Sequence, residues 1–116
     1  MSTSDIAVSP DQLAIIRAIL ARYLPENAQV WAYGSRARSV RVHRGSDLDL
    51  AIDAGSPLSL SIEGMMDEEF SESLLPFEVD IVDVHYMSPA FRFSVQKDFR
   101  PIAFARLEAE RQQFSL

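Results

Sequence analysis

The stretch Gly45-Ser46-Asp47-Leu48-Asp49-Leu50-Ala51-Ile52 carries the clearest local pattern in the chain. Its aspartates alternate with leucines, as polar and apolar residues do in a strand with one buried face. Asp47 and Asp49 should therefore project from one face, with Cα atoms roughly 6 to 7 Å apart. Two like charges this close repel each other unless a cation lies between them, and Mg²⁺ prefers carboxylate oxygens. The stretch predicts a strand that presents a platform for a divalent metal.

A third carboxylate is expected on the Val- and Ile-rich run Phe77–Val84, which reads as a neighbouring strand. It offers Glu78, Asp80 and Asp83. Asp80 lies in the middle of the strand, where a charge is costly without a role, and Asp83 should face the other way. We expect Asp80 to join the other two aspartates. Three carboxylates can hold two metal ions roughly 3.5 to 4 Å apart for in-line nucleotidyl transfer, with Asp80 as general base.

The turn Gly34-Ser35 precedes this platform in the chain. Glycine allows a sharp turn and a close approach of the backbone to a ligand. The N–H groups that follow, at the start of a short helix, form an anion site. Arg36 or Arg38 could neutralise a triphosphate and the departing pyrophosphate. We therefore assign Gly34, Ser35, Arg36 and Arg38 to nucleotide binding.

The remaining pattern predicts an α+β fold, in which helices pack on one small mixed β-sheet. Ser9, Pro10 and Gln12 form a capping signal for a first helix that Pro25 ends. The other expected elements are strands over 29–33, 47–53, 77–84 and 100–104, short helices over 35–39 and after Ser88-Pro89, a helix from Ser56-Pro57 to about residue 74, and a charged helical tail.

Length and composition bound the class of protein. The chain has 116 residues, of which 47% are hydrophobic, so we expect a single globular domain over residues 1–116 with a loose leader over residues 1–8. The absence of Cys excludes disulfides and thiolate metal sites and is compatible with the reducing cytosol. No secretory signal and no apolar run of about 20 residues is visible. We expect a cytoplasmic protein without a membrane partner.

The net charge of −6, from 17 acidic and 11 basic residues, argues against direct nucleic-acid binding and favours a basic protein partner. The basic residues are concentrated just before Asp47. One face of the helix expected before residue 74 is acidic, with Glu63, Asp67, Glu68, Glu69 and Glu72. Such a face is usually solvated, and its alternative role is docking of the basic partner.

Three motifs together resemble the minimal nucleotidyltransferase antitoxins of the DNA polymerase β-like superfamily: Gly34-Ser35-Arg36-Ala37-Arg38, the stretch 45–51, and the later Asp80. The resemblance spans roughly Trp31 to Val84. It implies a polymerase β-like core that uses Mg²⁺ and ATP. It also implies a cognate HEPN-domain ribonuclease toxin as partner, held in a hetero-oligomer, with AMP transferred to a toxin tyrosine. Ser39 stands where the family often has Gly.

Other interpretations remain open from the residues. The chain could be a non-catalytic antitoxin that covers a basic ribonuclease through its acidic helix. A D-x-D glycosyltransferase also pairs aspartates around a metal-bound nucleotide, but it needs a much larger domain and gives the Gly34-Ser35 turn no role. Asp47 and Asp49 could also be solvated acids at a strand edge. Arg36 and Arg38 could simply pair with the acidic helix face, in contacts of little energetic worth.

Overall fold

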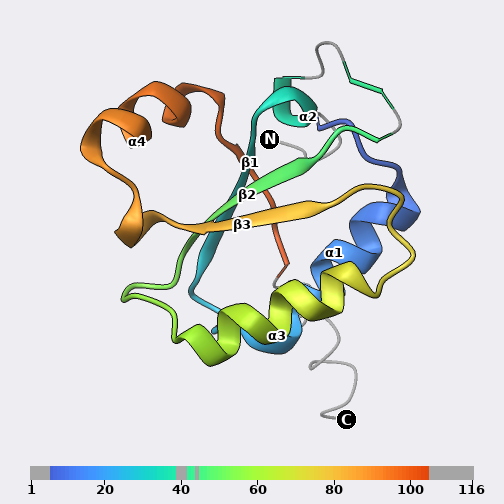
Figure 1. Cartoon of the computed structure of the whole chain (residues 1–116), viewed down its shortest axis with the longest axis horizontal. Helices are drawn as coiled ribbons and strands as arrows, with labels where there is room; N and C mark the ends of the chain where they lie inside the picture. Colours follow the sequence, from blue (N-terminus) through green and yellow to red (C-terminus); the bar gives the residue numbers. More distant parts are fainter. Residues whose placement is uncertain (1–5, 39–41, 44, 105–116) are drawn as a thin grey trace, which may run out of the picture.

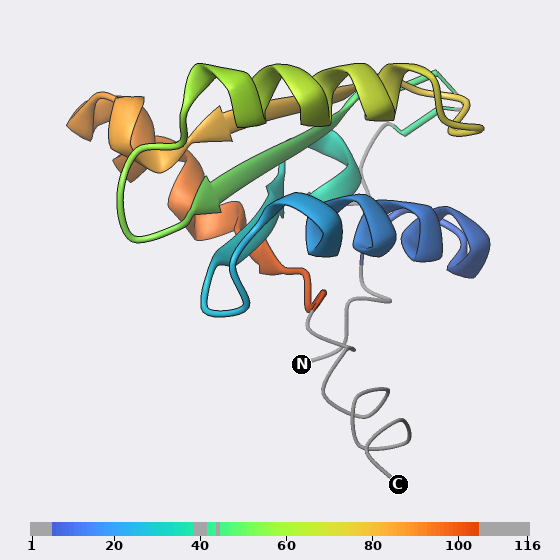
Figure 2. The same cartoon turned by 90° about the horizontal axis from the view of Figure 1, so that it is seen from below.

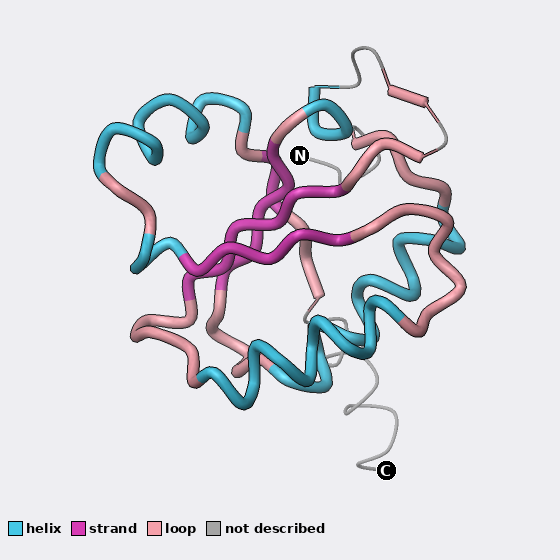
Figure 3. Tube along the Cα trace, viewed as in Figure 1, coloured by secondary structure: helices cyan, strands magenta, loops and turns pink. Residues whose placement is uncertain are grey.

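The computed structural model describes residues 6–38, 42–43 and 45–104. Its centre is a four-stranded sheet with the strand order β3-β2-β1-β4 (Figures 1 and 3). The strands are β1 (Gln29–Tyr33), β2 (Leu48–Asp53), β3 (Val79–Asp83) and β4 (Arg100–Pro101). β1 runs antiparallel to both β2 and β4, whereas β2 and β3 are parallel. The expected α+β fold with a mixed sheet is confirmed.

Two long helices, α1 (Pro10–Tyr23) and α3 (Leu60–Ser71), lie side by side and cover one face of the sheet (Figure 2). The shorter helical segments lie elsewhere. They are α2 (Ser35–Arg38), directly after β1, and η2 (Val84–Tyr86), α4 (Pro89–Val95) and η3 (Gln96–Asp98), which follow β3. None of the helices within the described ranges is long and apolar enough to span a bilayer.

The main core lies between the sheet and the helices α1 and α3. Leu48, Leu50 and Ile52 of β2 are fully buried there, as the alternation in the sequence predicts. They pack in one cluster with buried residues of both helices, among them Leu20 and Met66. The leucines of β2 thus face the main core, and its aspartates project from the opposite face of the sheet.

A second, smaller cluster covers part of that opposite face. Tyr33 and Ala51 are buried in it together with Val84. Trp31 stacks on Phe99 with ring centroids 5.0 Å apart. The segment that contains α4 and η3 therefore packs on the face of the sheet from which Asp49 projects.

The start of α3 differs from the sequence prediction. Ser59, rather than the Ser56-Pro57 pair, caps the helix, and its Oγ accepts a hydrogen bond from the Ile62 N–H (3.1 Å). Just before this cap, the Leu58 N–H donates to Asp83 Oδ2 (2.7 Å). The bond uses the Leu58 N–H for a tertiary contact at the end of β3, and α3 begins only at Leu60.

The expected loose leader does not reach residue 8. Ile6 is only 2% exposed and belongs to the main core, and the Ala7 N–H donates to the Arg36 carbonyl oxygen (2.9 Å). Residues 1–5 lie outside the described residues, as do Ser39 and the expected charged tail. The remaining elements are present with small shifts of their ends, and the strand expected over 100–104 is limited to Arg100–Pro101.

Candidate active site

Asp49 and Asp80 face each other across the parallel pair of strands. Their Cα atoms are direct partners in the β2–β3 register, so both side chains project from the same face of the sheet. Asp83 belongs to the opposite face, because it pairs with the buried Ile52. Asp83 is 2% exposed and accepts hydrogen bonds from the N–H groups of Leu58 and His85. The register thus brings Asp80, and not Asp83, to Asp49, as expected.

Asp47 lies one residue before β2 and is exposed. Burial raises the pKa of Asp49, and the neighbouring charges of Asp80 and then Asp47 raise it further. The three predicted carboxylates therefore lie within electrostatic reach of one another. Within the described ranges, no three acidic, His or Cys side chains already converge as a finished metal site. The preformed part is the Asp49–Asp80 pair, with Asp47 beside it.

Gly34 brings the backbone of the turn against the Asp49 carboxylate. Its φ of +83° lies in the left-handed region, which L side chains rarely adopt. A Cβ placed on Gly34 would lie only 2.5 Å from Asp49 Oδ2. Ser35 follows at the first position of α2. The predicted phosphate turn is thus in direct contact with Asp49, one of the predicted metal ligands, although the two are distant in sequence.

Tyr33 is a neighbour of the carboxylates that was not among the predicted site residues. It is the Cα partner of Asp49 in the β1–β2 register. Burial, followed by the charges of Asp49 and Asp80, raises the pKa of the Tyr33 hydroxyl to about 12. The phenol therefore stays neutral at ordinary pH. Its position directly before Gly34 is the signal that could have indicated this neighbourhood.

Asp67 of α3 is an acidic neighbour of Asp80 that the sequence did not assign to the site. Its pKa is raised by burial and by the charge of Asp80. With Asp80 and Glu78, it lines a cleft of about 560 Å³ between α3 and the edge strand β3. The sequence placed Asp67 only on an acidic helix face, because the packing angle of that helix against β3 cannot be read from periodicity.

Arg36 does not occupy the position expected of a phosphate ligand. It is 5% exposed, and its guanidinium lies 4.0 Å from the centroid of the Phe77 ring. Its Nε donates to the Ser46 carbonyl oxygen (2.7 Å). Its terminal nitrogens donate to the carbonyl oxygens of Ala7 (2.6 Å) and His43 (3.2 Å). These contacts fasten the segment just before Asp47, so we assign Arg36 to positioning that segment instead of binding nucleotide.

Arg38 lies at the exposed end of α2, with about half of its side chain accessible. Its Nη1 pairs with Asp98 Oδ2 at 3.2 Å. An exposed pair of this kind contributes little to stability and can exchange partners easily. The acidic face of α3 pairs instead with Arg22, through Glu69. Arg38 therefore remains the arginine of α2 that is available to a phosphate.

Comparisons with known proteins bear on the family of this chain. The family model for polymerase beta nucleotidyltransferases matches residues 15–103. The chain is 38% identical over 96 residues to the probable protein adenylyltransferase MntA of Haemophilus influenzae, a match that covers 83% of this chain and 82% of the relative. The resemblance inferred from the motifs is thereby confirmed.

Solved toxin–antitoxin structures share the fold. One, crystallised with AMP-PNP, has a TM-score of 0.62 and 21% identity, and the match covers 88% of this chain and 94% of that one. A mutant MntA–HpeT complex has a TM-score of 0.63 and 20% identity, covering 92% of this chain and 94% of the other. At this level of identity the two structures establish the common fold alone.

Proposed function

Because the chain belongs to the polymerase beta nucleotidyltransferase family, we propose that it is an antitoxin that transfers AMP from ATP to a tyrosine of a HEPN-domain toxin. The observation that carries the proposal is the register that opposes Asp49 and Asp80, with the Gly34 turn against the Asp49 carboxylate. The similarity to MntA, a probable protein adenylyltransferase, supports the type of reaction. The toxin–antitoxin complexes among the similar structures support the kind of partner.

The donor set fits Mg²⁺. Asp49 and Asp80 are opposed carboxylates whose mutual repulsion a divalent cation would relieve, and Asp47 adds a third hard oxygen donor beside them. Asp47, Asp49 and Asp80 would hold one or two ions. When bound, Mg²⁺ neutralises phosphate charge and lowers the pKa of the attacking hydroxyl.

The residues of the chain then have distinct tasks in the transfer. The acceptor oxygen attacks the α-phosphorus of ATP, the bond to the β-phosphate oxygen breaks, and pyrophosphate leaves. Asp80 accepts the acceptor proton. The backbone N–H groups after Gly34 and the Ser35 hydroxyl hold phosphate oxygens, and Arg38 balances the charge of the leaving pyrophosphate. Arg36 keeps the segment before Asp47 in place.

The direct test uses the product of the gene next to this one as the acceptor protein, incubated with the purified chain, Mg²⁺ and ATP labelled at the α-phosphate. The wild-type chain should label the acceptor, and mass spectrometry should place AMP on a tyrosine. Asp49→Asn should abolish the label. Asp53→Asn is the matched control, since it removes the same charge at the other end of β2. Persistent labelling by Asp49→Asn, or no labelling by the wild type, would reject the proposal.

Neutralisation by binding alone is the second candidate, and the acidic face of α3 favours it. In that case Asp49→Ala would still protect cells from the toxin, whereas charge reversal at Glu68 would not. Glu69 is a poor choice for this test, because it already bonds to the Tyr23 hydroxyl (2.7 Å) and pairs with Arg22.

A further inference from the structure

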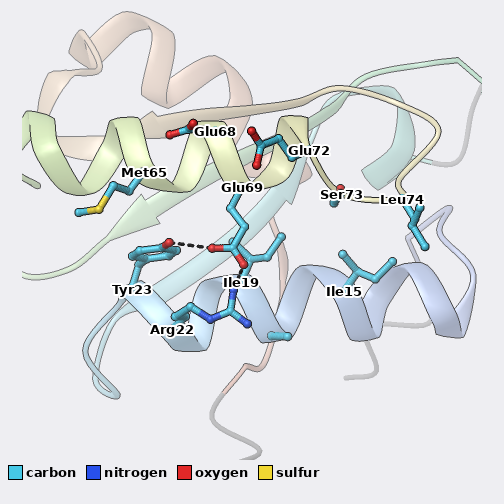
Figure 4. A pocket seen from close by; sticks show the side chains of 11 residues that line it. Ile15, Ile19, Arg22, Tyr23, Met65, Glu68, Glu69, Glu72, Ser73 and Leu74 are labelled. Atoms are coloured by element: carbon cyan, nitrogen blue, oxygen red, sulfur yellow. Dashed lines mark hydrogen bonds and ion pairs between the residues drawn. The ribbon is translucent and has the colours of Figure 1, made fainter.

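An apolar groove lies between α1 and α3, on the helix layer that covers the sheet face opposite Asp49 (Figure 4). Its volume is about 680 Å³. Ile15 and Ile19 of α1 point into it from one side and Met65 of α3 from the other, and Leu74 lies at its end. The groove is thus separated from the candidate active site by the sheet itself.

Two apolar side chains of this groove are left exposed. Leu74 is 91% exposed and Met65 is 41% exposed. Covering such surface is favourable, because it removes apolar area from water. Methionine also adapts its shape to different partners. The groove therefore offers a favourable contact that the described part of the chain does not use.

The rim of the groove is acidic. α3 contains four carboxylate residues and no Lys or Arg, and Glu72 directly follows it as the C-cap. Glu69 is held inside the groove by Arg22 and by the Tyr23 hydroxyl, whereas Glu68 and Glu72 are exposed on the rim. The overall charge of −6 has the same sign. A partner that lays basic groups along this rim would be selected over an acidic one.

We propose that this groove binds an amphipathic helix of the partner protein, with an apolar stripe for the floor and Lys or Arg residues for Glu68 and Glu72. The 12 residues of α3 span about 18 Å, the length of roughly three helical turns. A helix bound there would insert apolar residues at the i, i+3 or i+4, and i+7 positions. Since Asp49 and Asp80 lie beyond the sheet, docking leaves them accessible. The inference rests on the proposed function in taking the toxin as this partner.

The test measures binding and transfer separately. Binding of the neighbouring gene product is followed by calorimetry without ATP, for Leu74→Asp and for the double variant Glu68→Lys/Glu72→Lys. Both should weaken binding by about tenfold or more, and the double variant should also flatten its salt dependence. Leu60→Asp is the matched control for the first, because Leu60 is 85% exposed and lies outside the groove. Asp11→Lys, on the first turn of α1, controls for a change of charge.

The outcomes separate the two proposals. Loss of binding confined to the groove variants supports the docking site, even if no variant transfers AMP. Wild-type affinity in the groove variants, or equal weakening by the controls, overturns it, even if AMP is transferred. A wild-type chain that is dimeric alone, and monomeric as Leu74→Asp, would show that a second copy fills the groove and would also overturn the proposal. Unchanged melting temperatures establish that the variants are folded.

Discussion

Gly34 is the residue whose backbone lies against the carboxylate of Asp49, a candidate metal ligand. Gly34→Ala adds a Cβ where Asp49 Oδ2 lies 2.5 Å away, at a φ of +83°. We expect a loss of about 1–2 kcal/mol in stability from the left-handed backbone. AMP transfer should fall about 100-fold because the carboxylate is displaced. Urea unfolding and the α-labelled ATP assay measure the two effects.

Gly55 provides the control for this prediction. Its φ is +88°, but a Cβ there would have no atom within 4 Å. Gly55→Ala should therefore cost similar stability and leave AMP transfer unchanged. If both alanine variants lose transfer equally, the contact between Gly34 and Asp49 has no catalytic importance.

The stability effect of Asp49→Asn should depend on pH. The pKa of Asp49 is raised in the folded chain, by burial first and then by Asp80 and Asp47. The folded state then holds the proton more tightly than the unfolded state, so stability falls as pH rises from the ordinary carboxyl range through the raised pKa. At pH 7 the free energy of unfolding should therefore be larger for the variant than for the wild type. The gain should stay under about 1 kcal/mol, because solvent reaches this half-buried group.

That difference should vanish below about pH 3, where Asp49 is protonated in both states. Thermal unfolding at pH 3 and pH 7 measures it. A less stable variant at pH 7, or the same difference at both values, would contradict the view that Asp49 carries an unrelieved charge in the metal-free protein.

Some of the site residues could be placed from the sequence, and others could not. Strand alternation puts Asp80 and Asp83 on opposite faces, and the place of Asp80 in the middle of the strand favoured it as the third carboxylate; the register agrees with that choice. The place of Arg36 does not follow from any local pattern. Its acceptors are carbonyl oxygens of residues 7, 43 and 46, which only the folded chain brings together. A glycine turn followed by arginine therefore indicated a phosphate ligand where the structure has a buried support.

At the scale of elements, the start of α3 gives a clear prediction. Ser59→Ala removes the oxygen that accepts from the Ile62 N–H and should cost about 1 kcal/mol. Ser56→Ala should change the free energy of unfolding by less than about 0.5 kcal/mol, since Ser56 is exposed and lies before the helix. Urea unfolding compares them. A larger cost for Ser56→Ala would mean that the helix begins earlier.

Elements with strong local signals were predicted closely. The capping box at Ser9 and Gln12 is present at the start of α1, and β1 has the expected bounds. The α3 start was misplaced because Ser56-Pro57 and Ser59 both resemble caps. The bond from the Leu58 N–H to Asp83, 25 residues away, is a tertiary contact that no local pattern reveals.

At the scale of the whole molecule, the segment before α1 belongs to the fold. Ile6 is 2% exposed in the main core, so Ile6→Ala should cost about 2–4 kcal/mol in urea unfolding. Leu60→Ala, at a residue 85% exposed, is the surface control and should cost under about 0.5 kcal/mol. Equal effects of the two substitutions would mean that residues 6–8 form a loose leader after all.

The pairing of strands in the sheet also determines which carboxylates come together in the candidate site. Alternation alone puts Asp47 and Asp49 on one face, but it cannot say that β2 and β3 are parallel neighbours or that Asp49 faces Asp80. That register is long-range information, set by how both strands pack on α1 and α3. It is the feature of the structure on which the catalytic proposal depends.

Calorimetric titration with Mn²⁺ and a non-hydrolysable ATP analogue tests this claim most directly, in the wild type, Asp80→Asn and Glu78→Gln. Glu78 is an exposed acid two residues before Asp80 and lies just before β3. We predict that Asp80→Asn weakens binding of the metal–nucleotide by about tenfold or more, whereas Glu78→Gln leaves it nearly unchanged. Wild-type affinity in Asp80→Asn would contradict the shared site of Asp49 and Asp80.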